Sequence, residues 1–207
     1  NMSELFKNHF LQLHLLTSYP PANLNRDDLG RPKTAFMGGS LRLRVSSQSL
    51  KRAWRTSEVF ESALSGNLGV RTKENGIEIY NNLKEKGVSE KDAKTWAKSI
   101  AGVFGKPKKA DTNYPLRELE VEQLVHIGPE EKQEIDRLVS TISDRGSGPE
   151  EEELNLLRDY TGAADIALFG RMLADNTKFN VEAAAQVAHA LAVHRCQVEE
   201  DFFTAVD

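Results

Sequence analysis

Two kinds of hydrophobic periodicity divide this chain. Residues 9–18 alternate apolar and polar side chains, and residues 41–45 alternate apolar with basic ones, so both segments are predicted to be strands. Between them a pair of adjacent prolines stops any ladder, and residues 23–39 are rich in Asn, Asp, Gly and Pro, which predicts a long loop. After the second strand, Ser46 or Ser47 is expected to cap a helix.

A helical repeat dominates the middle of the chain. It predicts amphipathic helices, joined by charged or Gly- and Pro-containing linkers, over residues 77–86, 90–104, 130–143 and 150–160. Ser89 and Asp92 form a loose capping box at the start of the second of these helices. Further on, the pattern predicts a strand, an alanine-rich helix and a last strand over residues 164–173, 181–194 and 197–206.

The order of these elements favours an α+β fold. Strands alternate with two helices around one predicted sheet, and a helical block interrupts them, which suggests a split βαβ or ferredoxin-like plan. Residues 8–57 are expected to form the first part of this body. Residues 58–160 are expected to be a helical insertion, and residues 161–207 to complete the body.

Composition narrows the setting in which the protein works. With 207 residues, the chain corresponds to one large domain or to one domain that carries an insertion. Its single cysteine cannot form an internal disulfide, no apolar run approaches the roughly 18 residues needed to cross a membrane, and no secretory leader opens the sequence. We therefore expect a cytoplasmic protein without a membrane partner.

The net charge of −4 conceals a strong asymmetry along the chain. Residues 29–57 contain seven basic side chains and no acidic one, whereas residues 111–160 contain fourteen acidic side chains against five basic ones. A local cationic surface on an acidic protein is the electrostatic feature that a polyanion recognises. The alternative interpretation is two solvated faces of opposite sign.

The predicted helix after Ser46 and Ser47 carries the candidate chemistry. Its repeat places Leu50, Ala53 and Trp54 on one side, and on the other the polar and basic residues Gln48, Lys51, Arg52 and Arg55. A helix N-terminus has unpaired N–H groups, and together with hydroxyl, amide and cationic side chains these suit a phosphate chain. A solvated helix face is the alternative.

Asp27 and Asp28, in the loop after the first strand, are the candidate metal ligands. Paired carboxylates could hold Mg²⁺ for phosphodiester hydrolysis, but the same residues suit a turn closed by Asx hydrogen bonds. Gly38-Gly39 lacks the Lys-Ser/Thr sequel of a phosphate-binding loop. We therefore expect no cofactor.

Several strings together resemble a known family. The longest is Arg-Val-Ser-Ser-Gln-Ser-Leu-Lys-Arg-Ala at residues 44–53, and Asp-Ile-Ala-Leu-Phe-Gly-Arg-Met at residues 165–172 is the next. Shorter matches, in the same order along the chain, are residues 24–28, 38–39, 188–190 and 203–207. These strings resemble the N-terminal portion of the CasC (Cse4) family, the repeated backbone subunit of Cascade, the type I-E CRISPR surveillance complex.

The resemblance implies an RNA-recognition-motif-like palm with an inserted helical finger domain, followed in longer family members by a thumb. It also implies a non-catalytic subunit whose copies polymerise along the crRNA, alongside other Cascade subunits, and present the guide for pairing with target DNA. Contacts with a guide of any sequence are expected to go mainly to phosphates. We expect the RNA-binding residues to be Arg26, Lys33, Ser46, Gln48, Lys51, Arg52, Arg55, Arg171 and Met172.

An enzyme is the competing class. Backbone subunits of type III complexes cleave RNA with an acid in the loop after the first strand, where Asp27 and Asp28 lie. The resemblance to type I-E favours the non-catalytic function, because cutting is there delegated to a recruited helicase-nuclease.

Overall fold

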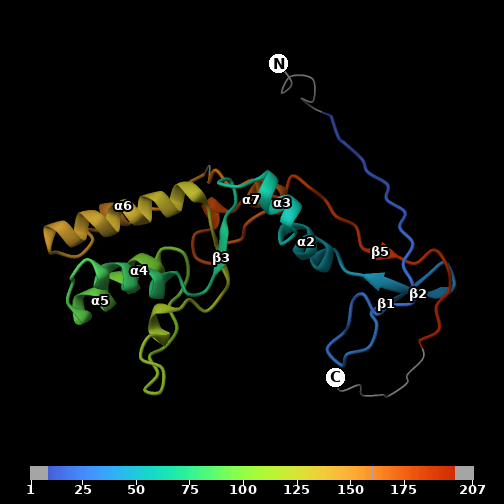
Figure 1. The fold of residues 1–207 in the computed structure, drawn as a ribbon, viewed down its shortest axis with the longest axis horizontal. Helices are drawn as coiled ribbons and strands as arrows, with labels where there is room; N and C mark the ends of the chain where they lie inside the picture. Colours follow the sequence, from blue (N-terminus) through green and yellow to red (C-terminus); the bar gives the residue numbers. More distant parts are fainter. Residues whose placement is uncertain (1–8, 160, 199–207) are drawn as a thin grey trace. The chain divides into compact units, whose positions relative to one another are not determined.

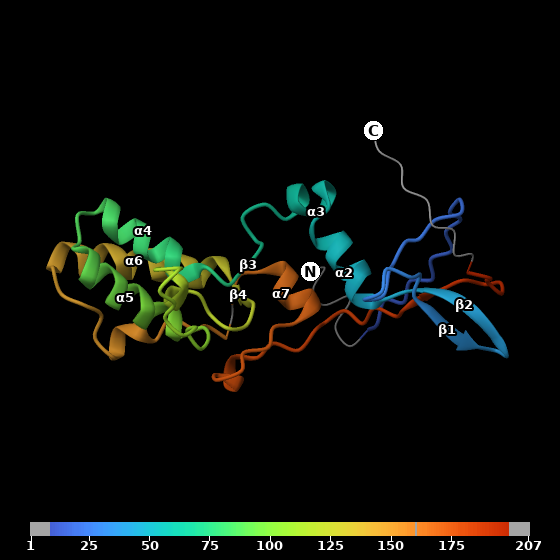
Figure 2. The same ribbon diagram turned by 90° about the horizontal axis from the view of Figure 1, so that it is seen from below.

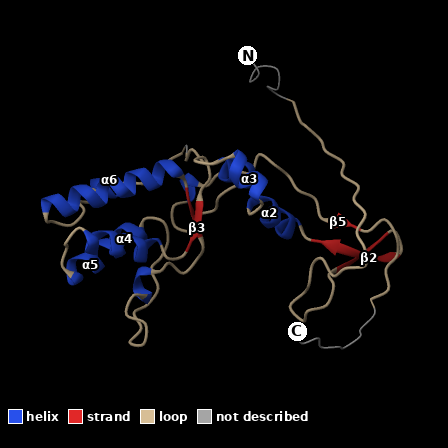
Figure 3. Ribbon diagram, viewed as in Figure 1, coloured by secondary structure: helices blue, strands red, loops and turns tan. Residues whose placement is uncertain are grey.

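The computed structural model describes residues 9–159 and 161–198, and the chain divides into two compact units. Unit 1 consists of Asn1–Ser46 and His189–Asp207, and unit 2 of Ser47–Ala188. Figure 3 shows that helices and strands are both present, so the predicted α+β class is confirmed. None of the helices in the described part of the chain is long and apolar enough to cross a membrane.

Unit 1 is built around a small antiparallel sheet. Its strands are β1 (Thr34–Met37), β2 (Ser40–Val45) and β5 (Ala190–Leu191), in the order β1-β2-β5 (Figure 1). Gly38 and Gly39 join β1 to β2 with φ of 60° and 71°. A two-residue type I′ turn requires positive φ at both positions, so glycine at each keeps the hairpin tight. The predicted strand at residues 41–45 is confirmed as β2, whereas β1 lies within residues 23–39, where only a loop was predicted, because its N–H and C=O groups pair with those of β2.

The prediction of a strand over residues 9–18 was wrong. This segment has no strand in the described part of the chain, and its apolar side chains, Phe10 and Leu11 among them, are exposed. Alternating polarity stabilises a strand only where a neighbouring strand takes up its N–H and C=O groups and one face is covered.

Unit 2 has its core between α4 (Asn75–Glu85), α5 (Glu90–Gly102) and α6 (Pro129–Arg145), which lie side by side in Figures 1 and 2. The helices predicted over residues 77–86, 90–104 and 130–143 are thus confirmed. Ser89 accepts the Asp92 N–H at the start of α5, as the capping pattern indicates. The apolar faces meet in a buried cluster that includes Ile79, Leu83, Ala97, Ile100, Leu119, Ile135, Val139 and Ile142.

The remaining elements of unit 2 are short. They are α2 (Ser47–Arg55), α3 (Glu58–Ala63), α7 (Ala164–Phe169), the 3-10 helices η1 (Arg117–Leu119), η2 (Glu152–Leu154) and η3 (Thr177–Phe179), and an antiparallel pair of strands, β3 (Val70–Thr72) and β4 (Val125–Ile127). The helix predicted after Ser46 is confirmed as α2, although its expected apolar side is not covered, since Ala53 and Trp54 are exposed.

The helix predicted over residues 150–160 was wrong, apart from the single turn of η2. Glu153 folds back instead, accepting the Glu150 N–H and a paired hydrogen bond from Arg145 at the end of α6. The Arg145 guanidinium and the Glu150 N–H lower the pKa of Glu153 to about 2, so this carboxylate stays ionised. These contacts stabilise a turn rather than a continuous helix.

The prediction also exchanged strand and helix near the end of unit 2. The predicted strand at residues 164–173 contains the helix α7, and the predicted helix at residues 181–194 is not a helix and contributes β5. The N–H groups of Ala184 and Ala185 donate to carbonyls in the last turn of α7. Carbonyls that the end of a helix leaves unpaired thereby take up N–H groups that a helix at residues 181–194 would need for itself. The last predicted strand, 197–206, lies almost entirely outside the described residues.

Candidate nucleic-acid interface

In unit 1 the loop before β1 is organised by Asn25. Its side-chain Oδ1 accepts the Ser46 N–H at 2.9 Å, and its backbone carbonyl accepts the Lys33 N–H at 2.8 Å. Arg26 is exposed, Lys33 is half-buried and Ser46 is buried. Of these predicted RNA-binding residues, Arg26 thus presents the most accessible charge, while the N–H of Ser46 is already occupied.

Asp27 closes a turn in the same loop. Its Oδ1 accepts the N–H groups of Leu29 at 2.9 Å and Arg31 at 2.8 Å. This is the turn closed by Asx hydrogen bonds that was predicted as the alternative to a metal site. Asp28 is exposed. Within the described ranges, no group of three or more His, Cys, Asp or Glu side chains is placed so that it could hold a metal ion.

Arg42 on β2 is used inside unit 1. Its Nε donates to the Met37 carbonyl at 3.0 Å, and its Nη1 donates to the Ala192 carbonyl, also at 3.0 Å. The guanidinium therefore links the β1–β2 hairpin to the chain after β5. This basic residue stabilises the sheet of unit 1 instead of presenting a free cation.

In unit 2, α2 presents a cationic surface. The helix contains no acidic residue; Gln48 and Arg52 are exposed, and Lys51 is half-buried. None of its residues, all of which the structure describes, is buried. Charged and amide groups that lie on one side of a helix and in reach of solvent are available to phosphate oxygens. We call Gln48, Lys51 and Arg52 the α2 cationic face.

Arg55 differs from its neighbours on α2. Its guanidinium lies 5.1 Å above the centre of the Phe169 ring, its Nε is 3.9 Å from Oδ2 of Asp165, and its side chain is only 17% exposed. Burial and the nearby charge of Arg71 lower the pKa of Arg55, while Asp165 opposes this effect. The structure thus turns Arg55 toward α7, away from the solvent that the α2 cationic face meets.

Asp165 is held from several directions. Its Oδ1 accepts the Gly69 N–H at 2.9 Å, and its Oδ2 lies 2.7 Å from Nε2 of His126 on β4. Burial opposes ionisation of this carboxyl, yet the contacts with His126 and Gly69 and the charge of Arg55 keep its pKa below the ordinary value. A carboxylate that is 1% exposed is therefore stabilised in its charged form.

Arg171 is buried, with Glu131 as its partner. Its Nη1 lies 2.7 Å from Oε2 of Glu131, both side chains are at most 1% exposed, and its Nη2 donates to the carbonyls of Arg158 and Phe179. Glu131 also accepts the N–H of Gly128, directly before α6. We therefore assign Arg171 to the interior of unit 2 and do not include it in the candidate interface.

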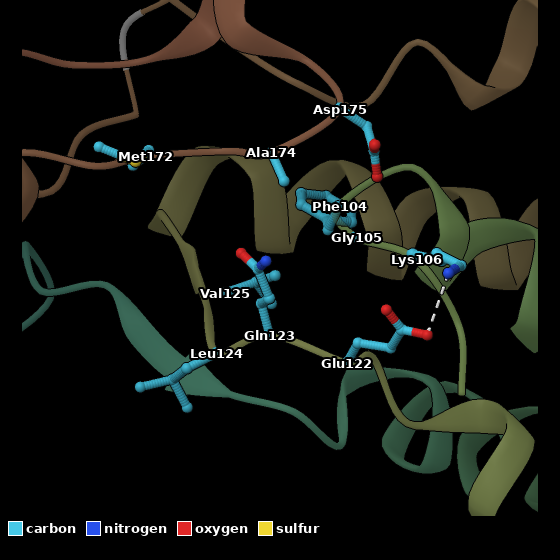
Figure 4. A pocket seen from close by; sticks show the side chains of 10 residues that line it. All are labelled: Phe104, Gly105, Lys106, Glu122, Gln123, Leu124, Val125, Met172, Ala174 and Asp175. Carbon is cyan, nitrogen blue, oxygen red and sulfur yellow. Dashed lines mark ion pairs between the residues drawn. The ribbon is translucent and has the colours of Figure 1, made fainter. Parts of the chain in front are cut away.

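Met172 is by contrast 84% exposed. It stands at the rim of a pocket of about 140 Å³, shown in Figure 4, which Phe104, Leu124 and Asp175 also line. An ion pair of 3.2 Å between Lys106 and Glu122 crosses another part of the rim. The pocket mixes apolar and charged groups and can hold a small side chain.

Sequence reasoning missed Asp165, His126 and Glu131. Asp165 was detectable, because it is a single charge inside the apolar run of residues 164–169. A buried carboxylate requires a partner, so its position signals a polar contact. Nothing in the sequence around Glu131 distinguishes it from its acidic neighbours.

Comparisons with known proteins agree with the resemblance. One chain of a solved CRISPR RNA-guided surveillance complex is 32% identical to this chain, with a TM-score of 0.69, and the match covers 86% of this chain and 56% of that one. A chain of a surveillance complex described as pre-nicking is 36% identical, also with a TM-score of 0.69, with 89% and 53% covered. None of the curated proteins matches.

This chain spans a little over half the length of both solved chains. The family model described as CT1975-like protein matches residues 11–207, which is almost the whole sequence. The predicted relationship to the CasC backbone subunit of CRISPR surveillance complexes is therefore confirmed, and the chain belongs to the CT1975-like protein family.

Proposed function

We propose that this chain is the N-terminal part of a non-catalytic backbone subunit of a type I-E Cascade complex, which binds crRNA and polymerises along it. The observation that carries the proposal is the likeness, at 32% and 36% identity, to chains of RNA-guided surveillance complexes. Its partners would be the crRNA, further copies of itself and other Cascade subunits, with target DNA reached through the guide. The setting would be the cytoplasm.

The placement of charge supports binding to a phosphate chain. The α2 cationic face and Arg26 are accessible to solvent, and residues 29–57 carry no acid that would repel a polyanion. Contacts of this kind do not depend on base identity, as a subunit that accepts any guide requires. An RNA-recognition-motif-like palm, with the helical core of unit 2 as its finger, is the architecture that we propose for the longer protein.

The test of this function is binding and assembly of the full-length protein on RNA. We expect it to purify with bound RNA and, once stripped, to bind unrelated single strands with similar affinity. On strands of increasing length, light scattering should report an increasing number of protein copies per RNA. Binding to one sequence only, or a fixed single copy on every length, would contradict the proposal.

The second candidate is a metal-dependent endoribonuclease that uses Asp27 and Asp28, and it predicts cleavage. We expect the full-length protein to leave guide-like and target-like RNA intact in Mg²⁺ or Mn²⁺, because Oδ1 of Asp27 is occupied by the N–H groups of Leu29 and Arg31. Gel assays of the wild-type protein and of a D27N/D28N variant decide between the two. The amide oxygen at position 27 can still accept both N–H groups, so the variant keeps its turn.

Cleavage that requires the metal and disappears in the D27N/D28N variant would replace the non-catalytic function with the enzymatic one. Cleavage that persists in the variant would point to a contaminating nuclease, and a nuclease-depleted preparation would then have to leave the RNA intact.

A further inference from the structure

The α2 helix has little packing to fix its direction. None of its described residues is buried, so it lacks the covered apolar face that normally orients a helix in a protein. At its last residue, Arg55, the side chain is only 17% exposed and faces α7. The contact of that side chain with α7 therefore helps to orient the last turn of α2 within unit 2.

The site that receives Arg55 is well built. Phe169 supplies an aromatic face at 5.1 Å, and Phe60 supports Phe169 with a ring-to-ring distance of 6.2 Å. Asp165 supplies the negative charge, with its Oδ2 3.9 Å from Nε of Arg55. A planar guanidinium can use a carboxylate and a ring together, which an ammonium group cannot do equally well.

Asp165 is itself fixed by backbone and side-chain contacts. The Gly69 N–H donates a hydrogen bond to its Oδ1 at 2.9 Å, and Nε2 of His126 lies 2.7 Å from its Oδ2 without hydrogen-bond geometry. A Cβ on Gly69 would lie 2.8 Å from the His126 ring, so glycine at this position is what admits the imidazole. Asp165 thus joins α7 to β4 and to the segment before β3, and it presents its remaining charge to Arg55.

We propose that Asp165, supported by His126 and acting with Phe169, is a positioning residue for RNA binding. It holds Arg55 and thereby the last turn of α2, so that the α2 cationic face keeps one orientation toward the guide. The inference rests on the proposed function. Arg55 acts here as the anchor of the helix, and Lys51 and Arg52, about one turn earlier, make the phosphate contacts.

Salt dependence of RNA binding separates positioning from direct contact. In a D165N variant of the full-length protein, only a fraction of the molecules should have α2 in the orientation that binds RNA. The apparent Kd is then the intrinsic Kd divided by that fraction. We expect Kd to rise roughly three- to tenfold at every salt concentration, with an unchanged salt slope, because the bound complex makes the same phosphate contacts. D144N makes the same chemical change at an exposed position of α6 and should leave Kd unaltered.

The variant R55K tests the role of the guanidinium. Lysine keeps the charge and still binds phosphate, so a direct RNA contact predicts almost full affinity. Positioning predicts a loss like that of D165N, and the double variant R55K/D165N should be no weaker than either single variant. Near-normal binding by R55K, or additive losses in the double variant, would overturn the inference.

Hydrogen exchange on the RNA-free protein gives a readout that does not require binding. In D165N we expect the amides of α2 to lose protection while those of α4, α5 and α6 keep theirs. Protection lost throughout unit 2 would mean that Asp165 stabilises the whole unit. Unchanged protection of α2 would contradict the inference that Asp165 holds this helix. If the wild-type protein binds no RNA, the proposed function fails, whereas this measurement still reports whether Asp165 holds α2.

Discussion

Replacing Arg171 by methionine, with Glu131 left in place, is expected to lower the free energy of unfolding by about 3–5 kcal/mol. The two side chains form a fully buried ion pair at 2.7 Å, so the variant would leave the Glu131 carboxylate in the interior without its cation. Breaking one partner of such a pair costs far more than the pair contributes, because the remaining charge stays desolvated. Equilibrium denaturation in urea measures the change.

R145M is the matched control for R171M. Arg145 also pairs with a carboxylate, Glu153, but both partners are in contact with solvent, so we expect a much smaller change. The double variant R171M/E131Q should recover part of the loss, because the amide of glutamine carries no charge and can still accept the Gly128 N–H. Wild-type stability of R171M would contradict the internal function that we assign to Arg171.

The second large effect concerns RNA affinity. Replacing Lys51 and Arg52 by alanine is expected to weaken binding similarly for guides of unrelated sequence, since phosphate contacts carry no base information. Each lost contact should reduce the salt slope by about 0.7, and at 0.1 M salt two contacts correspond to roughly 25-fold in Kd. Titrations of the full-length protein at several salt concentrations, on two guide sequences, measure both quantities.

K84A/K91A is the control for charge alone. Lys84 on α4 and Lys91 on α5 are exposed, and neither forms an ion pair with another described residue. The variant removes the same two charges elsewhere in unit 2, and we expect its salt slope to stay at the wild-type value. A loss restricted to one guide in K51A/R52A would indicate base recognition, and an unchanged slope would exclude these residues from the RNA interface.

The sequence correctly predicted those helices and strands whose signals come from residues near one another in the chain. The helices of unit 2 have a continuous apolar face and a recognisable beginning, as in α5 with Ser89, and these features need no knowledge of the rest of the chain. The β1–β2 hairpin was predicted only in part: β2 was expected, whereas β1 lies within residues 23–39, where a loop was predicted, although Gly38 and Gly39 suit the turn that pairs the two strands. The family was also readable, since residues 44–53 and the other strings that resemble it occur in one chain in the same order.

Partners distant in sequence decided the rest. An apolar run with one charge can be strand or helix, and residues 164–169 became α7 because Asp165 meets Gly69 and His126, 96 and 39 positions earlier. The alanine-rich segment after Val181 has good helix propensity, yet the N–H groups of Ala184 and Ala185 are taken by carbonyls of α7. Local propensity was outweighed because each of these backbone and carboxylate groups found a partner that only the folded chain brings near.

The same division holds for the candidate site. The sequence by itself determined that residues 29–57 form a cationic segment, that Gln48, Lys51 and Arg52 share a helix face, and that the chain belongs with CRISPR surveillance subunits. Only the tertiary structure decided which cations remain available: Arg42, Arg55 and Arg171 are held by carbonyls, a ring or carboxylates within their own units. The physical reason is that a charge is equally visible in a sequence whether it is solvated or buried, while burial and pairing arise from contacts between segments far apart in the chain.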